Sequence, residues 1–135
     1  TDLHMWNINE DAVKATFVSH MLMCQYAIDN NTNLLIIEDD IDIVKSVDWN
    51  SVDFTEFDIW NLTAKKVSCF AYFISVEGAI KLLKRLNRVE ITQAYDWELS
   101  KLDDSFKVKE EKEPIFIQVD RFESNIAPNG YEKLV

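Results

Sequence analysis

The chain has 135 residues and a formal net charge of −10 at neutral pH, with 47% hydrophobic and 28% charged residues. This length suits one domain with a buried core and is too short for two. The negative charge argues against nonspecific binding to the nucleic-acid backbone. No apolar run approaches the ~20 residues of a membrane span, and neither a signal peptide nor an internal repeat is recognisable.

Two cysteines, Cys24 and Cys69, are too few for a disulfide framework. We expect both to be buried thiols of a protein in a reducing compartment, and the sequence therefore predicts a cytoplasmic location. The first residue, Thr1, is small enough for ordinary removal of an initiator Met, but a fragment boundary would look the same.

The first predicted element is a helix that starts at Glu10. Asn9 can cap it, and acidic residues at 10 and 11 favour the positive helix start. Apolar residues then recur every three or four positions up to Ile28, and a polar turn over 29–33 ends the helix. Within it, Ser19 precedes His20. A lone histidine in a helix is usually a satisfied surface or core residue; the alternative is that His20 contacts a ligand.

The segment 34–40 organises the predicted domain. Four apolar residues, Leu34–Ile37, precede three carboxylates, Glu38, Asp39 and Asp40. A short continuous apolar run predicts a strand buried on both faces, as in a parallel sheet, and ligands collect at the carboxyl ends of such strands. Adjacent carboxylates repel one another unless a cation or hydrogen-bond donors offset the charge, and their oxygens suit Mg²⁺ or Mn²⁺. The alternative is a solvated acidic turn.

The middle of the chain alternates strands and helices, which indicates an α/β domain. The predicted pieces are an edge-like strand at 41–45, a loop at 48–56, strands at 57–62 and 67–74, and a helix Val76–Leu86 capped by Ser75. The basic side of that helix carries Lys81, Lys84, Arg85 and Arg88. We favour complementation of the helix dipole for this cluster over a patch that meets phosphate or an acidic partner.

The last part of the chain contains a second candidate acid. Asp96 can cap a short helix that ends near Leu102, with Trp97 as a core anchor. As chemistry, Asp96 is a carboxylate that could act as a general base or orient an acceptor hydroxyl. Two short strands, at 106–109 and 114–119, and a tail with an Asn129-Gly130 turn complete the chain.

In their order, these pieces resemble the domain of glycosyltransferase family 25, which contains lipooligosaccharide and procollagen galactosyltransferases. The resemblance covers roughly residues 15 to 126. The matching segments are 16–20 (TFVSH), 35–40 (LIIEDD), 71–75 (AYFIS) with Gly78-Ala79 and Leu82-Leu83, 95–97 (YDW) and 124–126 (SNI).

The resemblance implies a GT-A-like, Rossmann-like α/β fold, with a mixed sheet flanked by helices, and transfer of a sugar from a nucleotide-sugar donor to an acceptor hydroxyl. Glu38, Asp39 and Asp40 would play the part of the family's DxD motif and hold Mn²⁺ or Mg²⁺ on the donor diphosphate, with Glu38 and Asp40 in direct contact. The cation would stabilise the departing diphosphate as a Lewis acid. Asp96 would be the catalytic base or the group that orients the acceptor hydroxyl, and His20 and Ser19 would line the donor pocket.

The chain departs from the family in one respect. The family domain opens with a further strand–helix–strand portion, and Thr1–Ile8 can supply at most one short strand. We therefore expect a partial domain, truncated at the N-terminus, with an uncovered sheet edge that favours an oligomer or a completing protein partner. Two hypotheses follow: a metal-dependent hexosyltransferase, and a non-catalytic acidic protein-binding module or inhibitor on a truncated transferase scaffold.

Overall fold

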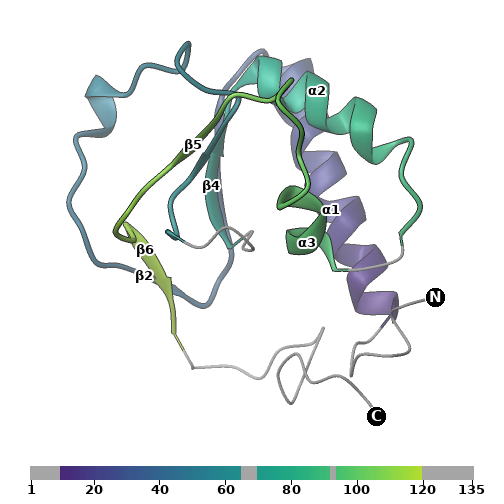
Figure 1. Ribbon diagram of the computed structural model, residues 1–135, viewed down its shortest axis with the longest axis horizontal. Coiled ribbons are helices and arrows are strands. Elements are labelled where there is room, and N and C mark those ends of the chain that lie inside the picture. The colour runs from purple at the N-terminus through teal and green to yellow at the C-terminus, as the bar shows by residue number, and fades with distance from the viewer. Residues whose placement is uncertain (1–9, 65–69, 92–93, 120–135) are drawn as a thin grey trace.

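The computed structural model describes residues 10–64, 70–91 and 94–119. Within them the protein is a mixed α/β structure whose helices flank a mixed parallel and antiparallel sheet (Figure 1). Several predicted features lie outside the described residues: Thr1–Ile8, Cys69, the segment 124–126 and the turn at Asn129-Gly130. None of the described helices combines the length and apolar character needed to cross a membrane.

Helix α1 spans Glu10–Asp29, as the periodicity predicts. Its buried side chains follow a helical spacing and face the sheet: Val13, Phe17, His20, Cys24 and Ala27. The chain leaves the helix through Asn31, whose φ of 48° lies in the left-handed region that asparagine tolerates better than most residues. The polar turn predicted at 29–33 is therefore confirmed.

The main sheet has four strands in the order β1-β4-β3-β5. The strands are β1 Leu34–Ile37, β4 Ala71–Ile74, β3 Ile59–Asn61 and β5 Val108–Glu110. β4 runs antiparallel to both of its neighbours, whereas β3 and β5 are parallel. Three strands, β1, β3 and β5, consequently run in one direction, and their carboxyl ends lie at the same edge of the sheet.

The prediction that Leu34–Ile37 is buried on both faces of a parallel sheet is wrong. Among the described residues β1 pairs with β4 alone, in antiparallel register, and forms the edge of the sheet. Only Ile36 of this strand is buried, while Leu35 and Ile37 are exposed. The apolar run identified the strand correctly, but it contains no information about which strands pair with it.

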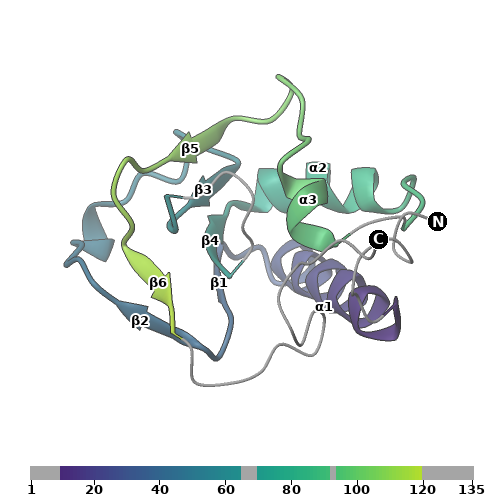
Figure 2. The same ribbon diagram turned by 60° about the horizontal axis from the view of Figure 1, so that its bottom comes forward.

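Helix α2, Val76–Leu86, has the predicted bounds, and the Ser75 hydroxyl caps it by accepting a hydrogen bond from the Gly78 backbone N–H at 3.0 Å. Gly78 allows a close approach, because a Cβ at this position would lie 2.1 Å from the carbonyl oxygen of Asp58. α2 packs against α1 on one face of the sheet, and the short helix α3, Tyr95–Leu99, contacts α1 beside them (Figure 2).

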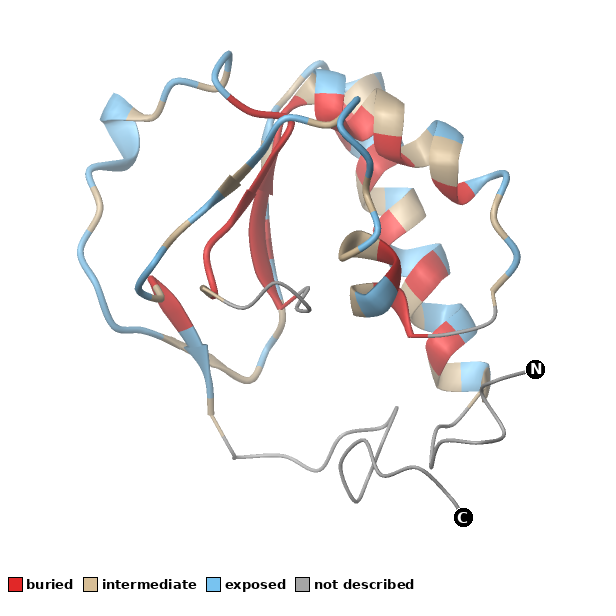
Figure 3. Ribbon diagram, in the orientation of Figure 1, coloured by how far each residue is buried: buried red, intermediate tan, exposed pale blue. Residues whose placement is uncertain are grey.

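The opposite face of the sheet is covered without an α-helix. The covering segment contains a single 3₁₀ turn, Trp49–Ser51. Its Trp49 ring packs against Trp60 and Phe73 from the sheet, with ring centroids 6.4 and 5.3 Å away. Beside it lies a small second sheet of β2, Ile41–Ile43, and β6, Phe116–Gln118. Buried residues thus line both faces of the central strands (Figure 3).

Two ion pairs tie α2 to the rest of the domain. Lys81 Nζ lies 2.8 Å from the carboxylate of the buried Asp58, and Arg85 lies 2.9 Å from the carboxylate of Glu98 in α3. The Asp58 carboxylate also accepts a hydrogen bond from the Lys107 backbone N–H at 2.9 Å. Two members of the basic cluster therefore make specific internal ion pairs, and Lys84 and Arg85 lie in the last turn of α2, as the helix-dipole interpretation requires.

Candidate functional site

The candidate site lies where β1, β3 and β5 end. The register places Ile36, Tyr72 and Asn61 side by side across three strands, on the face that the helices cover. The acidic residues 38–40 follow β1 directly, so they begin at this edge. In sheets with strands of common direction, ligands bind beyond the carboxyl ends.

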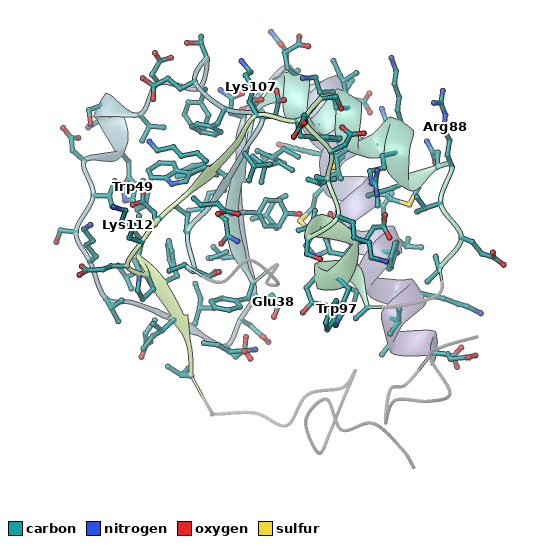
Figure 4. All side chains as sticks on the ribbon, viewed as in Figure 1. Glu38, Trp49, Arg88, Trp97, Lys107 and Lys112 are labelled. Atoms are coloured by element: carbon teal, nitrogen blue, oxygen red, sulfur yellow. The ribbon has the colours of Figure 1, made fainter. Side chains whose placement is uncertain are left out.

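The three consecutive carboxylates point in different directions. Glu38 is half-buried and continues the ladder of β1, because its backbone N–H donates to the Phe70 carbonyl at 2.9 Å. Figure 4 shows Glu38 at the strand ends, on the side where Trp97 of α3 lies. Asp39 is exposed. Asp40 directly precedes β2, and its Oδ2 accepts from the side chain of Gln118 in β6 at 2.9 Å.

These carboxylates do not form a complete cage for a cation. Within the described part of the chain, no three His, Cys, Asp or Glu side chains converge as a metal-binding group. However, Oδ1 of Asp40 is buried without a hydrogen-bond partner in the described structure, and such an oxygen is a suitable ligand for a hard cation. Mg²⁺ is commonly held by one or two carboxylates, with water and substrate phosphates completing its shell. The residues fit that open mode of binding.

His20 lies in the core, where α1, β4 and α3 meet. Its ring nitrogen Nδ1 is 2.5 Å from the Tyr72 hydroxyl, and its ring stacks on Tyr95 with centroids 4.1 Å apart. The two tyrosine hydroxyls are themselves 3.4 Å apart. We call these three residues, His20, Tyr72 and Tyr95, the polar cluster. Each is nearly inaccessible to solvent.

Burial determines the charge of His20. Desolvation lowers the pKa of its imidazole from 6.5 to about 4, so the ring is neutral at physiological pH. A neutral histidine bonded to a tyrosine hydroxyl can position that hydroxyl, but it brings no positive charge for a phosphate. Ser19, the next residue towards the N-terminus, is exposed on α1. The structure therefore separates the two residues that the sequence placed together in a donor pocket.

Helix α3 differs from its prediction. It spans Tyr95–Leu99, and its N-cap is Ala94, which makes no side-chain cap. Asp96 lies inside the first turn, where its carboxylate accepts from the Trp97 backbone N–H at 3.0 Å. Trp97 is not a core anchor, since 40% of it is exposed. The buried aromatic residue of this segment is Tyr95, whose ring packs edge-on against Phe17.

Asp96 has the environment of a candidate acid–base group. Its carboxyl is partly buried, and desolvation raises its pKa despite the hydrogen bond from the Trp97 N–H. It follows Tyr95 of the polar cluster directly in sequence. Asp40, in contrast, precedes β2, and its carboxylate accepts from Gln118 of β6. The β2–β6 pair and α3 lie on opposite sides of the main sheet (Figures 1 and 2).

The sequence did not single out Tyr72 and Tyr95, although they form the centre of this region. The available signal was a tyrosine within an otherwise apolar strand, 71–74. A buried tyrosine hydroxyl normally needs a hydrogen-bond partner, so Tyr72 predicts a polar group nearby. However, nothing in the sequence shows that Tyr72 of β4 lies beside His20 of α1, because that contact depends on how the helix packs on the sheet.

Comparison with models of known protein families gives no match to this chain. A comparison with curated protein sequences gives no significant match either.

Proposed function

We propose that the protein is a metal-assisted glycosyltransferase of the family 25 type, which transfers a hexose from a nucleotide-sugar donor to an acceptor hydroxyl. The main support is the position of Glu38 and Asp96 relative to the polar cluster. Glu38 follows the strand that pairs with Tyr72, and Asp96 follows Tyr95 in α3. One cluster of hydrogen-bonded rings thus connects β4, the strand that pairs with β1, with α3, the helix that carries the proposed base.

Glu38 is the proposed cation ligand, because it lies on the side of α3, which carries Asp96. Asp40, whose carboxylate accepts from Gln118 of β6, is the second candidate ligand, and Asp39 is their exposed neighbour. The half-buried carboxylate of Glu38 and the buried, unpaired Oδ1 of Asp40 support this assignment. A bound Mn²⁺ or Mg²⁺ would supply charge stabilisation for the departing diphosphate. The protein's own task is to hold these two carboxylates in place, which the β1 ladder and the Gln118 hydrogen bond do.

Asp96 is the proposed general base that accepts the proton of the acceptor hydroxyl. A base works best when its pKa approaches the working pH, and burial moves the pKa of Asp96 upwards, towards that range. The Trp97 N–H fixes the orientation of the carboxylate. His20 and Tyr72 are positioning residues in this proposal, because they are buried behind α3 and hold it against the sheet.

The proposal includes a GT-A-like fold that extends beyond the described sheet. Its support is the place of β1 at the sheet edge, with exposed Leu35 and Ile37. Further strands, from the same protein or from a partner, would pair with this edge and cover those side chains. In that arrangement the acidic motif would follow an interior strand, where the donor pocket would have walls on both sides.

An acidic protein-binding module is the second candidate. It is favoured by the absence of a three-ligand metal group among the described residues and by the net charge of −10. In this case Glu38, Asp39 and Asp96 would contact basic side chains of a partner and no sugar nucleotide would bind.

A binding and turnover experiment separates the two candidates. The protein is mixed with a panel of sugar nucleotides, with and without Mn²⁺, and melting temperature and release of nucleoside diphosphate are measured. Mn²⁺ should raise the melting temperature by mass action, and Glu38→Gln or Asp40→Asn should abolish the shift. Asp96→Asn should lower turnover about 100- to 10,000-fold. The exposed Asp104→Asn is the matched control. A melting temperature indifferent to every sugar nucleotide and to Mn²⁺ would contradict the transferase proposal.

A further inference from the structure

The outer face of α1 carries an exposed apolar row that no element of the described residues covers. Val18, Leu22 and Tyr26 are spaced four residues apart and are 51%, 65% and 56% exposed. On an α-helix this spacing places side chains along one ridge. Exposed Ala15 and Ser19 lie beside the ridge and leave room for a neighbouring helix. Single exposed apolar residues are ordinary on a protein surface, whereas a continuous row marks a contact site.

The inner face of the same helix is apolar as well. Val13, Phe17 and Cys24 are buried against the sheet and α2, so α1 is apolar on two opposite sides. A helix that is hydrophobic all round is normally buried within a larger assembly. The outer ridge therefore points to a second layer of protein on α1.

We propose that a second copy of this chain provides that layer, and that two α1 helices pack antiparallel about a two-fold axis near Leu22. In this arrangement Leu22 meets its symmetry mate, and Val18 meets Tyr26 of the partner subunit. A two-fold contact requires a self-complementary surface. The ridge meets this requirement. Its smaller side chain, Val18, and its larger one, Tyr26, each lie four residues from Leu22, on opposite sides of it.

The charges at the two ends of the ridge match the antiparallel arrangement. Lys14 precedes Leu22 by eight residues and Asp29 follows it by seven, and both are exposed. At ~1.5 Å of rise per residue, they lie at nearly equal distances on opposite sides of the axis. Lys14 therefore lies opposite Asp29 of the partner subunit, and the symmetry repeats this contact. A parallel pair would instead align like charges and like helix dipoles.

The α1 ridge is distinct from the exposed edge of β1, where further strands would pair in the proposed function. The β1 edge exposes Leu35 and Ile37, whose strand neighbours Phe73 and Ala71 belong to the core on the face away from α1. Ile37 is 51% exposed, the same fraction as Val18. Ile37→Glu therefore tests the rival contact at the β1 edge. Val44, which is also 51% exposed, is the matched control for a substitution on the α1 ridge.

Analytical ultracentrifugation of the full 135-residue chain, from micromolar to about 100 µM, tests the proposal. We expect a reversible monomer–dimer equilibrium. Leu22→Glu should weaken association at least about tenfold, because two carboxylates would meet at the axis. Ile37→Glu and the control Val44→Glu should leave the equilibrium unchanged. Circular dichroism should show that all of these variants remain folded, since all of these positions are exposed.

A charge exchange tests the antiparallel geometry. Lys14→Glu or Asp29→Lys alone should weaken the dimer about three- to tenfold, because each single change places like charges opposite each other at positions 14 and 29. The double variant restores opposite charges and should therefore restore the dimer. A monomer at every concentration would overturn the proposal. A dimer lost with Ile37→Glu but kept with Leu22→Glu would also overturn it and would assign the contact to the β1 edge. Failure of the double variant to restore association would exclude the antiparallel pairing.

Discussion

The two faces of the main sheet are covered by different structures and bury different chemistry. The helix face is covered by α1 and α2, with α3 beside them, and its core combines aliphatic side chains with the polar cluster of His20, Tyr72 and Tyr95. The loop face is covered by the segment around the 3₁₀ turn, and most of its core residues are aromatic. Its core residues are Phe57, Trp60, Leu62, Phe70, Ala71, Phe73, Ile115 and Phe116.

The difference indicates a division of roles between the faces. On the loop face, Trp60 stacks with Phe73 at 5.7 Å, its indole N–H donates to Glu111, and Lys109 lies 4.1 Å above its ring. These two polar contacts both hold the Trp60 ring. On the helix face, the buried polar groups stand next to the candidate acids of the strand ends. We infer that the loop face chiefly provides stability and the helix face positions the site.

The largest effect is expected from Trp60→Ala. This residue is 4% exposed and lies at the centre of the aromatic core. Loss of a buried tryptophan costs about 3–5 kcal/mol of unfolding free energy, which urea unfolding measures. Binding of Mn²⁺ per folded molecule should not change. A variant that keeps its stability but loses Mn²⁺ binding would contradict the division between the faces.

Acidification should destabilise the helix face through His20. The pKa of its imidazole is about 4 in the folded protein and 6.5 in the unfolded chain. The unfolded state therefore binds more protons between these values, so the contribution is complete above pH 6.5 and is lost as the pH falls to 4. The shift corresponds to about 3 kcal/mol.

The measurement compares the unfolding free energy of the protein with that of His20→Gln across this pH range. The raised pKa of Asp96 acts in the opposite direction, because protonation of that carboxyl favours the folded state. Asp96 is present in both proteins, so subtracting the pH curve of His20→Gln from that of the unmodified protein removes the contribution of Asp96. An unchanged pH slope in His20→Gln would show that the histidine is not buried in its neutral form.

A double-mutant cycle on His20 and Tyr72 should show an intermediate effect. Either Tyr72→Phe or His20→Leu removes one side of a 2.5 Å hydrogen bond between buried groups, at a cost of about 1–3 kcal/mol. The double variant should be less unstable than the sum, because neither His20 nor Tyr72 is then left in the core without the other. Thermal unfolding measures the coupling. Additive effects would mean that the two residues do not act as a pair.

Much of the fold could be predicted from the sequence, because local patterns determine its helices. The bounds of α2, its Ser75 cap and the extent of α1 follow from spacing and end residues, and all three are confirmed. The pairing of β1 could not be predicted, because a four-residue apolar strand is compatible with many partners. Sheet order depends on contacts between distant segments, as in the pairing of β3 with β5.

The site was predictable only in part, for the same physical reason. Glu38, Asp39 and Asp40 are adjacent in sequence, so their place after β1 followed from the strand alone. Their separation into different directions depends on Gln118, which is 78 residues away from Asp40. The interaction of His20 with Tyr72 likewise spans 52 residues. Nothing in the local pattern of either segment encodes such a contact.

The smallest effect is expected from Trp97→Ala, which makes a matched pair with Trp60→Ala. Both residues are tryptophans, but Trp97 is 40% exposed on α3 and Trp60 is 4% exposed. Because 40% of the Trp97 surface is already in water, its truncation should lower the unfolding free energy by about 1–2 kcal/mol, less than that of Trp60. Urea unfolding of the two variants under one condition gives the comparison. A loss at Trp97 as large as that at Trp60 would mean that α3 is covered in solution, because only burial of the ring gives its removal such a cost.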